Sequence, residues 1–292
     1  LSCLDGKVDN ANKVSFYGAV SGEVNNEILQ VTPEDDFNVN GYKRTIKEDW
    51  ELFNSLETIQ LDAGGSVTAY LKSDGSVWTM GYGISGQLGN GENVNSAYPV
   101  RAIGLSNIIQ ISVGETHCLA LSSSGSVYAW GSNTNKQISA SETSSINIPT
   151  QISLPVCNIK FVEAGSNNSF VSDGTTVYAW GQNNYGQLGV GHKLSVYYPE
   201  AVQNISNITY IDSFGKHTFF ISGSKMLYAC GSNNHSVLGN PDWGTITSPE
   251  LVKEYVDKIA TGNNHAVAID TKGYVFAVSY THLRAHETVL DL

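Results

Sequence analysis

Short alternations of apolar and polar residues recur along the chain at intervals of 50 residues. The run VYAWG ends at Gly131 and again at Gly181, and the related runs VWTMG and LYACG end at Gly81 and Gly231. Four prolines keep the same step, at Pro99, Pro149, Pro199 and Pro249. Alternation with a period of two predicts half-buried strands. A fixed step of this length predicts a repeat architecture.

Each interval contains signals for four short strands. A first strand ends in glycine, as in IQISVG ending at Gly114, and a second apolar run follows, as in HCLAL at His117–Leu121. The VYAWG run is the third strand, and the fourth follows the proline. No helical period separates them, so each interval predicts one propeller blade, which must stack on its neighbours to cover both faces. The predicted fold is therefore an all-β propeller with units 56–105, 106–155, 156–205, 206–255 and a partial 256–277.

The motifs resemble the regulator of chromosome condensation repeat family. The resemblance covers residues 56–277 and is carried by AGG at 63–65, VGETH at 113–117, VYAWGSN at 127–133 and VYAWGQNNYGQLGVG at 177–191. Met80 and Cys230 depart from it where Trp130 and Trp180 stand, and unit two loses the last glycine of its loop, which reads KQISA at 136–140. WD-type repeats carry a Trp-Asp pair that this chain lacks. The family resemblance implies seven blades, so we expect a fragment with about five to five and a half of them.

Both ends of the chain fit the repeat poorly. Residues 1–55 are interpreted as a divergent acidic blade with an insertion around Glu34–Trp50, in which KVSFYG at Lys13–Gly18 is the third strand; a separate N-terminal segment is the alternative. Residues 278–292 begin with VSYTHLRAHET, which reads as the translation of a sequencing adapter. We therefore expect the natural sequence to end near Ala277, with a non-native tail after it. The histidines and glutamate of that tail are accordingly not interpreted as a metal or catalytic cluster.

Composition and charge narrow the partners. Charged residues make up 15% of the chain and hydrophobic residues 41%, which is typical of a packed, sheet-rich protein. The net charge is −11, and no segment is basic, so a nucleic-acid partner is disfavoured. No apolar run is long enough to span a membrane, and no signal peptide opens the chain. The chain starts at Leu1 rather than Met, so its compartment stays open, with an intracellular location slightly favoured.

Candidate chemistry is sparse. His117, His217 and His265 follow the first strand in three units and are interpreted as structural anchors, because equivalent positions in successive blades diverge. The loop glycines suit turns better than a phosphate site, and Cys3, Cys118, Cys157 and Cys230 lack zinc spacing. Chance explains the N-x-S/T patterns at 167, 204 and 207. We therefore expect no enzyme, no cofactor and no catalytic or metal-binding residue; the residues that bind a partner are not identified.

The function expected from these observations is a non-catalytic scaffold for protein–protein interaction. Propeller loops can vary in sequence while the strands that carry them stay fixed. The family resemblance implies protein partners, whose identity the sequence does not give. It also implies two alternatives, a guanine-nucleotide exchange factor for a small GTPase and a secreted enzyme inhibitor of the same fold.

Overall fold

The structure is a computed structural model that describes residues 5–8, 14–17, 52–141, 143–239 and 244–278. The chain divides into two compact units, Leu1–Glu57 and Thr58–Leu292. In the first unit, β1 (Asp5–Val8) and β2 (Val14–Tyr17) pair as an antiparallel hairpin. The expected third strand at Lys13–Gly18 therefore exists as a strand; its assignment to a blade stays a prediction. The expected insertion at 34–50 lies outside the described residues, as does the tail after 278.

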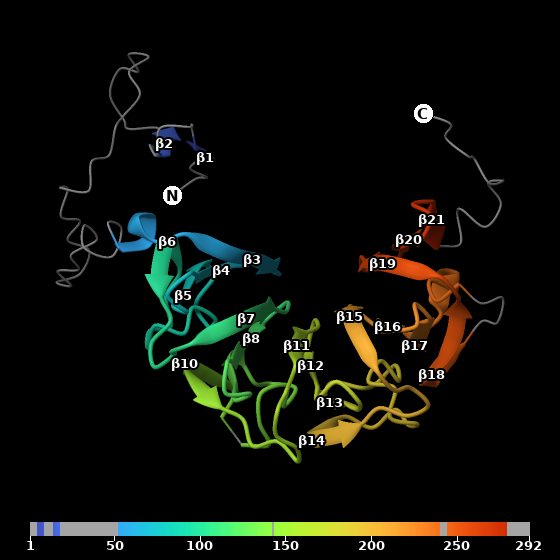
Figure 1. Ribbon diagram of the computed structural model, residues 1–292. Coiled ribbons are helices and arrows are strands. Elements are labelled where there is room, and N and C mark those ends of the chain that lie inside the picture. Colours follow the sequence, from blue (N-terminus) through green and yellow to red (C-terminus); the bar gives the residue numbers. More distant parts are fainter. Residues whose placement is uncertain (1–4, 9–13, 18–51, 142, 240–243, 279–292) are drawn as a thin grey trace. The chain divides into compact units, whose positions relative to one another are not determined.

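The second unit consists of consecutive antiparallel sheets, and within each sheet every strand pairs with its neighbours along the chain. These sheets stand side by side in chain order as the blades of a propeller (Figure 1). The strands of blades 1 and 2 are β3 (Thr58–Gly64), β4 (Val67–Lys72), β5 (Val77–Gly81), β6 (Ser96–Arg101), β7 (Ile108–Val113), β8 (His117–Ser122), β9 (Val127–Ser132) and β10 (Ser145–Gln151).

The later blades repeat this plan, and the last sheet has three described strands. A single turn of 3₁₀ helix, η1 (Asn234–Ser236), lies in the loop of blade 4. The strands of blades 3 to 5 are β11 (Phe161–Ala164), β12 (Asn168–Ser172), β13 (Val177–Gly181), β14 (Val196–Ala201), β15 (Ile208–Phe214), β16 (His217–Ser222), β17 (Leu227–Ser232), β18 (Thr245–Lys253), β19 (Val256–Thr261), β20 (Ala266–Asp270) and β21 (Val275–Val278).

Apolar side chains fill the spaces between blades. One core cluster joins blades 1 and 2, a second runs from blade 2 to blade 4, and a third joins blades 4 and 5. Trp130 and Trp180 are buried, and the strand register places Met80 and Cys230 in the same slot, as the sequence predicts. The repeat therefore extends from the sequence into the packing, because each blade offers the same two faces to its neighbours.

The register corrects one detail of the repeat. The pattern YIDSFG predicts that the first strand of unit four ends at Gly215, but β15 ends at Phe214, which pairs with His217. The strands β7, β11 and β19 also end one residue before the predicted glycines, Gly114, Gly165 and Gly262. Gly215 lies in the turn that follows, at a φ of +61°, as Gly65 does in blade 1 at +55°. Gly215 therefore corresponds to Gly65 of blade 1, whereas Gly114, Gly165 and Gly262 of the other blades correspond to Gly64.

Candidate binding surface

Side chains of the innermost strands join each blade to the next. The Gln60 amide donates to the Ile111 carbonyl at 2.8 Å and accepts from the Ile111 N–H at 2.9 Å. Gln110 repeats both bonds with Val162, at 3.0 and 3.1 Å. Each glutamine thus continues the pattern of a β ladder across a gap between sheets. The sequence offers no sign of this role, because glutamine on a strand usually indicates a solvated face.

Carboxylates on these strands take part in the same two junctions and in the one between blades 4 and 5. Asp62 accepts from the Val113 N–H at 2.7 Å, and Asp212 accepts from the N–H and hydroxyl of Thr261 at 2.9 and 2.7 Å. Glu163 accepts from Ser112 Oγ at 3.3 Å. Burial is the main cause that raises the pKa of all three carboxyls, and their mutual repulsion raises that of Glu163 and Asp212 further. They act as junction acceptors; no group that could hold a metal ion occurs among the described residues.

The histidines at the start of the second strands do not form one cluster, because His117 contacts Ser169 of blade 3 whereas His217 lies near Gly262 and His265 of blade 5. His117 Nε2 lies 2.8 Å from Ser169 Oγ of the next blade, and burial lowers the pKa of His117 to about 3. His217 belongs to another junction, and burial lowers its pKa to about 4 against a hydrogen bond with the Gly262 backbone. His265 is exposed. A neutral imidazole bonded across a junction is what the anchor interpretation predicts.

The long loop between the third and fourth strands fastens blade 1 to blade 2 and blade 3 to blade 4 at the outer edge. In blade 1 the Gly91 N–H donates to the Asn147 carbonyl of blade 2 at 2.9 Å, and in blade 3 the Gly191 N–H donates to the Thr247 carbonyl of blade 4 at 2.8 Å. The acceptor lies in both cases in an outward bulge just before the repeated proline, where the fourth strand loses register with the third. We call this contact the loop latch.

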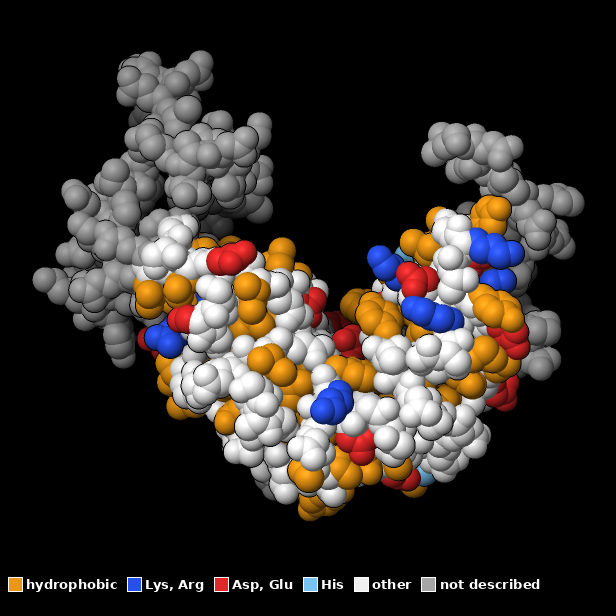
Figure 2. All heavy atoms as spheres, in the orientation of Figure 1, with side chains coloured by type: hydrophobic (Ala, Val, Ile, Leu, Met, Phe, Trp, Pro, Cys, Tyr) orange, Lys and Arg blue, Asp and Glu red, His pale blue; other side chains and the backbone are white. Residues whose placement is uncertain are grey.

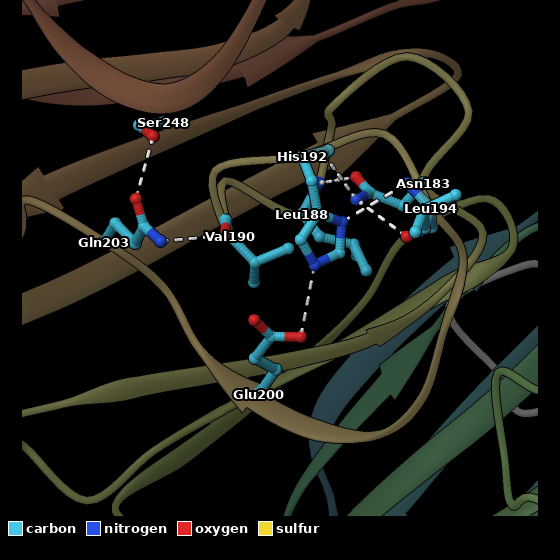
Figure 3. A network of polar contacts seen from close by, with 8 residues as sticks. All are labelled: Asn183, Leu188, Val190, His192, Leu194, Glu200, Gln203 and Ser248. Atoms are coloured by element: carbon cyan, nitrogen blue, oxygen red, sulfur yellow. Dashed lines mark hydrogen bonds and ion pairs between the residues drawn. The ribbon is translucent and has the colours of Figure 1, made fainter.

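Polar side chains reinforce the latch between blades 3 and 4 (Figure 3). Gln203 donates to the Val190 carbonyl at 2.9 Å and accepts from Ser248 Oγ at 3.1 Å. The loop itself is held by Asn183, which donates to the carbonyls of His192 and Leu194. The His192 ring faces Glu200, with Nε2 3.4 Å from the carboxylate. The glycine-rich segment is therefore a structural loop, as the turn interpretation predicts.

The loop of blade 2 is the exception. Lys136, Ser139 and Ser141 stand where blade 3 has Gly186, Gly189 and Gly191. Its anchoring residue, Asn133, donates to the carbonyls of Ser141 and Thr143 instead of their equivalents one residue further on. The backbone of this loop is therefore shifted by one residue. Among the residues that the structure describes, no hydrogen bond runs from it to the bulge of blade 3.

That bulge carries the most exposed aromatic pair of the repeat. Tyr197 is 54% exposed and Tyr198 74%, and Leu194, from the loop just before them, is 74% exposed. The corresponding residues Asn147 and Thr247 are partly buried. Figure 2 shows apolar side chains scattered over one face of the molecule. Tyrosine pairs on a rigid strand are typical of interfaces. We call Leu194, Tyr197 and Tyr198 the tyrosine patch.

Comparison with known proteins gives the fold a family. The model of the RCC1-like domain matches residues 22–281. The chain belongs to the RCC1-like domain family. Its repeat is therefore of the type that the motifs predicted, and the match includes residues 22–55, ahead of the first blade.

Solved structures of RCC1-like proteins share this fold at low identity. Prp20p from Saccharomyces cerevisiae, described with its binding properties to Gsp1p and histones, is 20% identical over 93% of this chain and 68% of that one, with a TM-score of 0.70. Human WBSCR16 is 20% identical over 77% of this chain and 62% of that one, with a TM-score of 0.68. Yeast RCC1 (Prp20) bound to Kap60 is 20% identical over 77% of this chain and 54% of that one, with a TM-score of 0.66. The RCC1-like chain thus spans less than two thirds of the length of two of these three. Curated protein sequences give no match.

Proposed function

We propose that this RCC1-like chain is a non-catalytic scaffold that binds another protein. The observation that carries the proposal is the tyrosine patch, in which two adjacent tyrosines and a leucine stand exposed on a strand that the rest of the blade holds in place. Exposed aromatic side chains with little freedom to move make favourable contact surface at low entropic cost. The described residues also contain no helix long and apolar enough to cross a membrane.

A site-specific photo-crosslinker tests this proposal on the whole chain. With benzoylphenylalanine in place of Tyr198, irradiation in a cell extract should give one or a few discrete protein adducts that excess unlabelled chain suppresses. The same label at Tyr274, exposed in blade 5, is the control position. Labels at Tyr198, Ile59, Ile84 and Tyr274 that all give no suppressible adduct would contradict a scaffold function.

The assay for guanine-nucleotide exchange separates the scaffold from its main alternative. A small GTPase loaded with a fluorescent nucleotide should release it at the intrinsic rate in the presence of this chain. Accelerated release at substoichiometric amounts of the chain would replace the scaffold by exchange activity, because only a catalyst turns over.

A further inference from the structure

The chain contains its own example of a segment that binds a bulge. At two junctions the bulge carbonyl receives a backbone N–H from a glycine, Gly91 or Gly191, in an extended loop. Both glycines have positive φ, +85° and +90°, which lets the N–H approach where a side chain would be strained. A Cβ at Gly191 would also meet the Gln203 side chain at 2.6 Å. Glycine is therefore the residue that fits against a bulge of this kind.

Among the described residues, which leave out Glu142 of the blade 2 loop, no backbone N–H donates to the bulge of blade 3. Ser141 corresponds to the latch donor in sequence, and the one-residue shift of the loop puts Ala140 in its place; neither N–H donates to the bulge, and that of Ser141 donates to Ser139 Oγ at 3.4 Å. Lys136 Nζ donates to the Ser141 carbonyl at 2.8 Å and so closes the loop on itself. The printed contacts of Lys136 and of the Ser141 N–H therefore lie within the loop itself. Sequence and geometry agree, because serine at positions that need positive φ would be strained.

We propose that the tyrosine patch binds an extended, glycine-containing basic segment of a partner protein, which donates a backbone N–H to the Tyr197 carbonyl. This inference rests on the proposed scaffold function and specifies its site and the class of its partner. The incoming glycine takes the place that Gly91 and Gly191 take at the other two junctions. Side chains next to that glycine pack on the rings of Tyr197 and Tyr198.

The negative charge around the tyrosine patch favours a basic segment as its partner. Glu200 lies two residues after Tyr198 on the same strand, with its side chain 45% exposed, and the chain as a whole carries a net charge of −11. An arginine beside the glycine can stack on a tyrosine ring and reach the carboxylate with the same side chain. An acidic segment would meet repulsion at the same place.

Selection from a displayed library of random peptides on the whole chain tests the inference. The enriched peptides should share glycine next to arginine or lysine. Measured by fluorescence polarisation, their affinity should fall at least about tenfold in the double variant Tyr197→Ala and Tyr198→Ala, which corresponds to one good contact of about 1.4 kcal/mol. Ile148→Ala changes the residue of the blade 2 bulge that corresponds to Tyr198 and should leave the affinity within twofold.

A second variant tests the site without touching the tyrosines. The triple change Lys136→Gly, Ser139→Gly and Ser141→Gly gives the blade 2 loop the glycines of its neighbours, and it should cover the bulge and weaken the same peptides at least about tenfold. Slowed exchange of the residue 141 amide would show that the latch has formed.

The outcomes separate this inference from the scaffold function. Peptides that bind the double variant as well as the natural chain would overturn the tyrosine patch as their site and leave the scaffold standing. A library that yields no enriched peptide would also overturn the inference, while the adducts of the crosslinking experiment decide the scaffold independently.

Discussion

The loops of blades 2 and 3 have the same place in the repeat, yet in the part of the chain that the structure describes only the blade 3 loop donates a backbone hydrogen bond to the next blade. The blade 3 loop has glycines at 186, 189 and 191 and donates the Gly191 N–H to Thr247. The blade 2 loop has lysine and serines there and bonds to itself. A propeller can therefore keep its strands and inner junctions while a few loop residues decide which outer edge stays open.

The difference between the loops is accompanied by a difference between the tryptophans of the third strands, Trp130 and Trp180. Trp130 packs against Gly89 of blade 1 and donates to the Gln87 carbonyl at 2.8 Å. Trp180 faces the loop that has Ser139 in place of that glycine, and its Nε1 is buried without a hydrogen-bond partner. A Cβ added at Gly89 would lie 2.9 Å from the indole nitrogen of Trp130. The carbonyl that corresponds to that of Gln87 belongs to Gln137, and it accepts from Ser169 Oγ at 2.7 Å in place of the Trp180 N–H.

Copying the blade 2 residue into blade 1 should give the largest effect. Gly89→Ser adds a Cβ against Trp130 at a φ of +65°, so we expect a loss of about 2–3 kcal/mol in the free energy of unfolding. Denaturant titration of the whole chain measures it. Ser139→Ala is the matched control and should change stability by less than about 0.5 kcal/mol. Equal losses at both positions would remove the distinction between the loops.

Removing the indole nitrogens should give a smaller and unequal effect. Trp130→Phe loses packing and the bond to the Gln87 carbonyl, whereas Trp180→Phe loses packing and relieves a buried, unpaired N–H. We therefore expect Trp130→Phe to cost about 1–2 kcal/mol more than Trp180→Phe. Thermal unfolding of the two variants gives the comparison, and a larger loss at Trp180 would contradict it.

The carboxyl groups on the inner strands should make the free energy of unfolding depend on pH, and the loops should not alter this dependence. The pKa of Glu163 is raised in the folded chain, so the folded state favours its protonated form and the charge destabilises folding above that pKa. Glu163→Gln should therefore stabilise the chain at pH 7–8 by about 1 kcal/mol, with the gain shrinking as the pH falls toward the ordinary glutamate pKa. A loss of stability at pH 8 would show that the carboxylate is needed as an ion.

The buried histidines act in the opposite direction. Folding lowers the pKa of His117 to about 3 and of His217 to about 4, so the unfolded chain binds protons first. Their contribution is fully present above the ordinary histidine pKa of about 6.5 and is lost as the pH falls below it. In His117→Asn, unfolding followed between pH 7.5 and 5 should fall less steeply than in the natural chain.

The exposed ion pair of the blade 3 loop should contribute least. His192 and Glu200 are 39% and 45% exposed, so Glu200→Gln should change the free energy of unfolding by less than about 0.5 kcal/mol. Gln203→Ala, which removes a contact to the Val190 carbonyl in the same loop, should cost more. A reversed order in thermal melts would place the loop's stability in the ion pair.

The repeat was predictable from the sequence, and the site was not. Glycines and aromatic residues at a fixed step predicted the blades because strands and turns are decided locally. The hydrogen bonds of Gln60 with Ile111 and the loop latch depend on a neighbouring blade, so no local sequence pattern indicates them. The missing glycines at 136–141 were visible, but their consequence for Tyr197 appears only when blade 3 is set beside that loop. Phe214 misled the alignment because glycine at the next position fits the same pattern.

Hydrogen exchange at the amides of Gly91, Ser141 and Gly191, which share one position of the sequence repeat, tests the central claim most directly. The N–H groups of Gly91 and Gly191 donate to the next blade, and the Ser141 N–H does not. We predict that exchange at Gly91 and Gly191 is at least about tenfold slower, relative to the intrinsic rates, than at Ser141. Equal protection at all three would show that the blade 2 loop is latched to blade 3 and that the tyrosine patch is no exception.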